Sequence, residues 1–182
     1  AVRDLDGEAA LRFERECQAM GAVSEHPHIV TVHGAGFTRS GRPYLVMAYL
    51  PGGSLQDRVD REGPLGWTAV SLYGVHLAGA LETAHQAGIV HRDVKPGNVL
   101  LSGYGEVQLT YFGIARIAGG RETARGVVTA SVAHAAPEVV DGERPSVAAD
   151  VYSLASTLYE LLAGRPAFIH PDDRSIVPVL RR

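Results

Sequence analysis

The segment from His91 to Asn98 concentrates side chains that could do chemistry, with the sequence His-Arg-Asp-Val-Lys-Pro-Gly-Asn. Asp93 offers a carboxylate that can accept a proton, and Lys95 offers a cation that can neutralise negative charge. Asn98 adds an amide oxygen, a hard ligand for a hard metal cation. Because Lys95 is the only lysine of the chain, any mechanism that needs two lysines is excluded. The alternative is structural, with Asp93 as a turn residue and His91 as a core histidine.

Composition excludes several classes of protein. The net charge of −3 comes without strong local runs of one sign, which argues against a nucleic-acid-binding surface. No apolar run approaches the roughly 20 residues that span a bilayer, and no N-terminal stretch resembles a signal peptide. The single cysteine, Cys17, cannot form an internal disulfide, so we expect a cytoplasmic protein without membrane contact in this segment.

Two long helices are predicted on either side of this segment. From Trp67 to Ala87 the apolar residues follow helical spacing, and Gly88 stands where a left-handed residue ends a helix. A second helix is predicted from Ser146, a good N-cap type, to Gly164. Because alanines occupy the face opposite its apolar stripe, this helix is expected to be buried nearly all round.

The N-terminal part reads as a helix followed by a hairpin. An amphipathic helix is predicted from Gly7 to about Met20. Residues 29–32 and 44–47 read as short strands, joined through the turn signal at 40–43. The Pro-Gly-Gly break at 51–53 is the best boundary between this β-rich part and the helical remainder.

Several motifs then follow one another in a characteristic order. Residues 91–98 fit H-R-D-x-x-x-x-N, Tyr111-Phe112-Gly113 stands in the place of D-F-G, and Ala136-Pro137-Glu138 matches A-P-E. With these motifs the chain resembles the eukaryotic-like bacterial serine/threonine protein kinases over essentially all of its 182 residues. The resemblance implies that residues 150–154 open the buried helix of the large lobe.

The resemblance implies a two-lobed, protein-kinase-like α+β fold, present in part. Residues 1–50 would form a partial small lobe with one helix, part of its sheet and the hinge. Residues 51–182 would form the first half of the helical large lobe, with the catalytic loop and the activation segment. The chain is expected to be truncated at both ends. The glycine-rich loop and the phosphate-binding lysine of the family are missing before it, and it stops at Arg182, short of a complete large lobe.

The resemblance also assigns catalytic roles. Transfer of a phosphoryl group needs mainly in-line positioning and neutralisation of charge on the phosphates. Asp93 would orient the incoming hydroxyl as base, Lys95 would place its cation near the transferring phosphate, and Asn98 would hold Mg²⁺. Arg92 would read a phosphorylated activation segment, which is expected to run from Tyr111 to about Glu138.

ATP is the nucleotide that the resemblance implies, bound at the hinge. Met47 falls at the gatekeeper position, and the following backbone would hydrogen-bond adenine. Leu100 would pack beneath the adenine ring or beneath the catalytic loop itself. Ser54 would lie near the ribose. The residues expected at the nucleotide are Met47, Ala48, Tyr49, Leu50, Ser54 and Leu100. Glu16 matches the acid that pairs with the phosphate-binding lysine, although a glutamate on a solvated helix face is the alternative.

Tyr111 departs from the family, because it occupies the position of the metal-binding D-F-G aspartate. A phenol with a pKa of about 10 is neutral at pH 7 and is a poor ligand for Mg²⁺. The main hypothesis is a fragment of a kinase that transfers the ATP γ-phosphate to serine or threonine of protein substrates. The alternative is a pseudokinase, a nucleotide-binding or scaffolding module that transfers nothing. A helical interaction domain with accidental motifs is the third, remote alternative.

The spacing of His26, His28 and His33 could suggest a metal site. His-Pro-x-Ile-Val is, however, typical of the loop after the small-lobe helix of kinases, so a structural role is favoured. Among the residues of the activation segment, Thr123 or Thr129 is the predicted phosphoacceptor.

Overall fold

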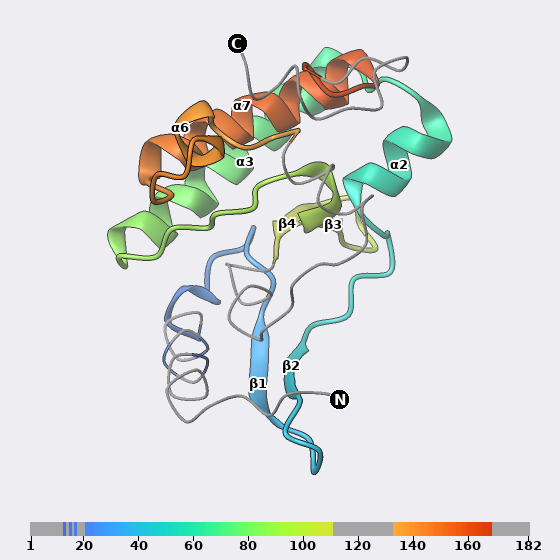
Figure 1. Ribbon diagram of the computed structural model, residues 1–182. Helices are drawn as coiled ribbons and strands as arrows, with labels where there is room; N and C mark the ends of the chain where they lie inside the picture. The colour runs from blue at the N-terminus through green and yellow to red at the C-terminus, as the bar shows by residue number, and fades with distance from the viewer. Residues whose placement is uncertain (1–12, 14, 16, 18–20, 111–132, 169–182) are drawn as a thin grey trace.

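The computed structural model describes residues 13, 15, 17, 21–110 and 133–168. Figure 1 shows two long helices lying side by side. One pair of short strands lies between these helices and a second, separate pair of strands. In chain order the elements are β1 (Val32–Phe37), β2 (Pro43–Met47), α2 (Leu55–Glu62), α3 (Trp67–Gln86), the 3₁₀ turn η1 (Pro96–Asn98), β3 (Val99–Leu101), β4 (Val107–Leu109), α6 (Pro137–Val140) and α7 (Val147–Ala163). None of the described helices is long and apolar enough to cross a membrane.

The N-terminal hairpin exists, but its first strand differs from the prediction. β1 begins at Val32 rather than at residue 29 and pairs antiparallel with β2. Ile29 instead forms a parallel bridge with Leu109 at the end of β4. The Val30 N–H donates to the Leu109 carbonyl (2.9 Å), and the Leu109 N–H donates to the His28 carbonyl (2.8 Å). The predicted strand was wrong because its first residues hydrogen-bond to the β3–β4 hairpin, which connects the two parts of the chain.

The helices α3 and α7 confirm the predicted spans, including their ends. Gly88 has a φ of 75° after α3, and Gly164 has a φ of 70° as the left-handed C-cap of α7. Ser146 caps the start of α7 by accepting a hydrogen bond from the Ala149 N–H. Of the helix predicted from residue 7 to 20, the described residues Phe13, Arg15 and Cys17 are helical.

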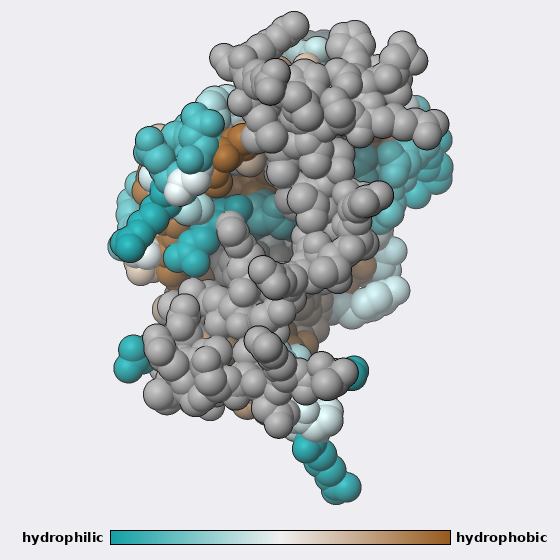
Figure 2. Space-filling view, viewed as in Figure 1, coloured by the Kyte–Doolittle hydropathy of each residue, from teal (hydrophilic) through white to brown (hydrophobic). Residues whose placement is uncertain are grey.

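Burial of α7 is one-sided, so the prediction that it is buried nearly all round was wrong. Ala148, Val151, Ala155 and Tyr159 are exposed, whereas Leu161 is fully buried. Figure 2 shows hydrophobic residues on the surface around α3, α6 and α7. Alanine tolerates either environment, so its position opposite an apolar stripe does not indicate burial.

The helix α2 and the β3–β4 hairpin were not predicted individually. Ser54 and Asp57 form a capping box at the start of α2, which fixes where that helix begins. Just before it, Gly52 lies so close to β3 that an added Cβ would stand 2.6 Å from the Leu101 Cβ. Only glycine permits this approach, which pairs residues 52–54 with 100–101 and brings the end of the hinge against the sheet.

Candidate active site

Asp93, Lys95 and Asn98 are in direct contact. Lys95 Nζ lies 2.9 Å from Asp93 Oδ2. The Asn98 side-chain Nδ2 donates both to Asp93 Oδ2 (2.8 Å) and to the Asp93 carbonyl (2.7 Å). The 3₁₀ turn η1 produces this contact, because it reverses the chain within three residues and returns Asn98 to Asp93. The motif therefore forms one polar cluster, which brings the three predicted residues together.

Asn98 presents its amide oxygen away from Asp93. Both protons of the amide nitrogen are used by Asp93, so Oδ1 is the atom that can bind a cation. Asn98 is 8% exposed, and the two hydrogen bonds to Asp93 hold its side chain. The backbone carbonyl of Asn98 accepts a hydrogen bond from the Thr110 N–H (3.0 Å), which joins the loop to the end of β4.

A buried carboxylate on α7 fixes the backbone that presents Asp93. Asp150 is 1% exposed and accepts from the N–H groups of His91 (2.7 Å) and Arg92 (2.8 Å). It also lies 2.8 Å from Nε2 of His85. Arg92 has a φ of 72°, a left-handed conformation that costs a residue with a Cβ on the order of 1 kcal/mol. Asp150 holds that turn in place.

His91 is fully buried and links the loop to the residue before Tyr111. Its Nε2 lies 2.9 Å from the Thr110 carbonyl, and its Nδ1 accepts from the Asp93 N–H (3.2 Å). Burial lowers the pKa of His91 below its ordinary value, against the opposing effect of the nearby Asp150 carboxylate. The neutral ring with its proton on Nε2 satisfies both hydrogen bonds. His91 is therefore a core histidine, the structural alternative that the sequence offered for it.

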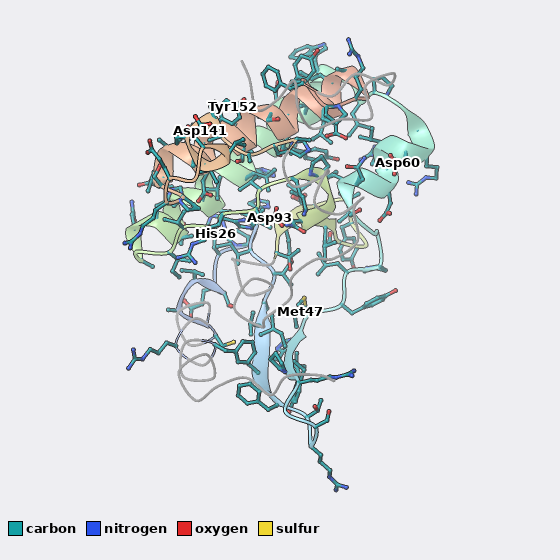
Figure 3. The ribbon with its side chains drawn as sticks, viewed as in Figure 1. His26, Met47, Asp60, Asp93, Asp141 and Tyr152 are labelled. Carbon is teal, nitrogen blue, oxygen red and sulfur yellow. The ribbon has the colours of Figure 1, made fainter. Side chains whose placement is uncertain are left out.

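The hinge follows β2 and leaves backbone groups available. The Ala48 N–H donates to the Thr31 carbonyl (2.9 Å), whereas Leu50, 9% exposed, forms no backbone hydrogen bond among the described residues. Tyr49 is exposed to solvent. Met47 lies at the end of β2, and its sulfur accepts from the Thr110 hydroxyl (3.8 Å). Figure 3 shows Asp93 above Met47, between the helices and the hairpin.

Ser54 and Leu100 lie together beyond the hinge, joined by an antiparallel bridge. The Ser54 hydroxyl is committed to the capping box, since it donates to Asp57 Oδ2 (2.7 Å) and accepts from the Asp57 N–H. The Ser54 hydroxyl and the Ser54 backbone N–H both donate to the Asp57 carboxylate, and these two hydrogen bonds lower the pKa of Asp57. A ribose contact for Ser54 stays a prediction, as does the adenine contact for Leu100.

Other predicted residues lie outside the described part of the chain: Glu16, Tyr111, Thr123 and Thr129. Sequence reasoning in turn gave no role to His85 and Thr110, and no anchoring role to Asp150. An acidic residue near the start of a helix with an apolar stripe was the available signal for Asp150, because a buried carboxylate needs several donors. A cavity of about 330 Å³, lined by Phe13, Cys17 and residues of β1, contains none of the nucleotide-binding residues in its described lining.

The helices, the short hairpins and the anchored loop define a partial kinase-like α+β fold. The chain belongs to the protein kinase domain family, whose sequence pattern matches residues 3–180. The resemblance stated from the motifs is thereby confirmed.

Relatives of the chain include serine/threonine-protein kinases of mycobacteria. PknK of Mycobacterium bovis is 56% identical over 165 residues, which cover 91% of this chain and 15% of the relative. PknK of Mycobacterium tuberculosis has the same identity and coverage. PknB of Mycolicibacterium smegmatis is 39% identical over 165 residues, which cover 87% of this chain and 26% of the relative. The chain therefore spans a small part of the length of these relatives.

Proposed function

We propose that this chain is part of the catalytic domain of an ATP-dependent kinase that phosphorylates serine or threonine in proteins. The observation that carries the proposal is the contact of Asp93 with both Lys95 and Asn98. A carboxylate, a cation and an amide oxygen held within a few ångströms suit phosphoryl transfer, which depends on positioning and charge neutralisation. The single, buried Cys17 favours a reducing compartment such as the cytoplasm.

The hinge fits the adenine of ATP. Buried backbone groups are normally hydrogen-bonded, and Leu50 is buried without a backbone partner among the described residues. An adenine edge carries both a donor and an acceptor and would satisfy such groups. Met47 would then border the base, and Leu100 on β3 would lie near its face.

The described donor set fits Mg²⁺ in part. Asn98 Oδ1 is a hard oxygen ligand on a buried, doubly anchored side chain. When bound, Mg²⁺ would neutralise charge that develops on the phosphates. The family takes a second ligand from the position of Tyr111, where a neutral phenol is a poor substitute.

The residues of the loop have separate tasks in this proposal. The Asp93 carboxylate would accept a hydrogen bond from the hydroxyl of the protein substrate, orient it, and take its proton. Lys95, whose side chain is 15% exposed, would pair with the Asp93 carboxylate and would present positive charge to the transferring phosphate. Asp150 would act indirectly, by holding the Arg92 turn that aims Asp93.

Tyr111 supports a second candidate function, a pseudokinase that holds nucleotide without transferring phosphate. The two candidates share the hinge and differ in the metal ligand. Binding and transfer must therefore be measured separately.

We expect ADP without Mg²⁺ to bind at the hinge, because the adenine contacts do not involve Tyr111. In amide ¹⁵N–¹H correlation spectra of the chain, ADP should shift the signals of Ala48, Tyr49 and Leu50. The signal of Tyr104, at the tip of the β3–β4 hairpin, serves as the control and should stay in place. Hinge signals that do not move at saturating ADP would contradict nucleotide binding at this site, and with it both candidate functions.

A further inference from the structure

Three side chains from distant parts of the sequence meet beside α3. His28 lies in the loop before β1, His76 lies on α3, and Glu106 precedes β4. One nitrogen of each histidine and one carboxylate oxygen of Glu106 all lie within 4.8 Å of one another. Neither the motifs at residues 91–98, 111–113 and 136–138 nor the proposed phosphoryl transfer uses any of the three. We propose that His28, His76 and Glu106 bind a divalent transition-metal ion of the Zn²⁺ class.

His28 is prepared for metal binding by its hydrogen bond. Its Nδ1 lies 2.8 Å from the Val107 carbonyl, which can only accept, so Nδ1 carries the proton. The other ring nitrogen, Nε2, then holds a lone pair. A backbone carbonyl that fixes the tautomer in this way is the usual partner of a metal-binding histidine.

His76 presents a buried nitrogen that lacks a hydrogen-bond partner. Its Nδ1 is buried without a hydrogen bond in the part of the chain that the structure describes. The nearest carboxylate oxygen, Glu106 Oε2, is 3.8 Å away, which is too long for a hydrogen bond. An ion about 2.0–2.2 Å from each atom would span that distance. The metal therefore accounts for a buried polar atom that is otherwise unsatisfied.

The two imidazole rings are stacked, with centroids 3.8 Å apart and an interplanar angle of 12°. Lone pairs of parallel rings do not converge on one ion, so one ring must turn about its χ2 torsion when the ion binds. That torsion has a broad energy minimum, and the turn is a small rearrangement.

The loop that carries His28 is held against α3 by a neighbouring histidine. His26 packs over Gly79, where an added Cβ would stand 3.6 Å from its Nε2. The Nδ1 atom of His26 accepts the backbone N–H of His28 (3.2 Å), which fixes the direction of that residue. Figure 3 shows His26 between α3 and the start of the hairpin. Gly79 lies one helical turn from His76, so this packing holds His28 beside its partner.

The donor set selects the class of metal. Two imidazole nitrogens and one carboxylate suit Zn²⁺ and similar ions, whereas Mg²⁺ prefers oxygen ligands alone. The site is therefore chemically distinct from Asn98. A bound ion would tie the His28 loop to α3 and to the β3–β4 hairpin.

The test is Zn²⁺ binding to the untagged chain, measured by competition with a chromophoric chelator in the presence of excess Mg²⁺. We expect one Zn²⁺ per chain, bound without competition from Mg²⁺. Glu106→Gln and His76→Gln should each weaken binding by about tenfold or more. Glu106 is more than half exposed, so its variant should fold normally. His33→Gln, an exposed histidine on β1, is the matched control and should bind like the unmodified chain.

Two results for the unmodified chain and Glu106→Gln would overturn the proposal. One is the absence of stoichiometric Zn²⁺ binding to a chain whose circular dichroism shows it to be folded. The other is equal affinity of the unmodified chain and Glu106→Gln. Loss of binding in His33→Gln alone would point to a different set of ligands and would equally reject this site. ADP binding at the hinge should be the same with and without Zn²⁺, so failure here leaves the proposed kinase function separately testable.

Discussion

Replacing Tyr111 by aspartate should raise the rate of phosphate transfer by on the order of 10³-fold or more, a difference of about 4 kcal/mol in transition-state free energy. The D-F-G aspartate of the family contributes a full negative charge to the metal ions that bridge the ATP phosphates. A neutral phenol contributes no charge and adds a bulky ring at the same position. Nucleotide binding should change less, because the hinge contacts are separate from this ligand.

Tyr111 itself lies outside the described residues, but the residue before it forms two hydrogen bonds. Thr110, its neighbour in the chain, donates its N–H to the Asn98 carbonyl and its hydroxyl to the Met47 sulfur. Thr110 therefore joins the catalytic loop to the end of β2, next to the hinge.

The measurement compares Tyr111 and Tyr111→Asp for transfer to a generic basic protein substrate. It requires the longest form of the protein that its gene encodes, because this chain spans a small part of its relatives. If the turnover rates of the two proteins differ by less than about tenfold, the metal is held in another way.

Replacing Asp150 by alanine should destabilise the fold by about 3–5 kcal/mol, because it leaves the buried donors of His91, Arg92 and His85 without their acceptor. In addition, the strained turn at Arg92 would lose the carboxylate that holds it. Asp150→Asn keeps the shape of the side chain and one acceptor oxygen, so it should lower the stability of the fold by less than Asp150→Ala.

Urea denaturation of the chain gives the free energy of unfolding of each variant. Asp60→Ala, an exposed carboxylate on α2, is the control and should change stability by less than about 0.5 kcal/mol. A loss below about 1 kcal/mol in Asp150→Ala would mean that water or another group replaces the carboxylate.

The parts that the sequence predicted are those whose signals are local. The helices at Trp67–Gln86 and Val147–Ala163 follow from apolar spacing and from cap residues within one segment. The contact among Asp93, Lys95 and Asn98 follows from a motif of eight residues with a tight turn inside it. Each of these depends on neighbours in the sequence, which a pattern can reveal.

What the sequence did not predict depends on distant pairing. Ile29 left the expected hairpin because Leu109, eighty residues later, bridges to it. Asp150 became an anchor because its helix lies beside a loop from another part of the chain. His28, His76 and Glu106 share no motif and meet only after the loop, the helix and the hairpin have packed.

The most direct test of the proposed function is phosphate transfer by the Tyr111→Asp protein with and without the further change Asp93→Asn. The asparagine keeps the size of the side chain and its contact with Asn98 but removes the base. We predict that transfer to serine and threonine of a protein substrate falls by about 10²–10⁴-fold, while the ADP-induced shifts at the hinge stay unchanged. Transfer that persists at the same rate after Asp93→Asn would contradict the assignment of this loop as the catalytic centre.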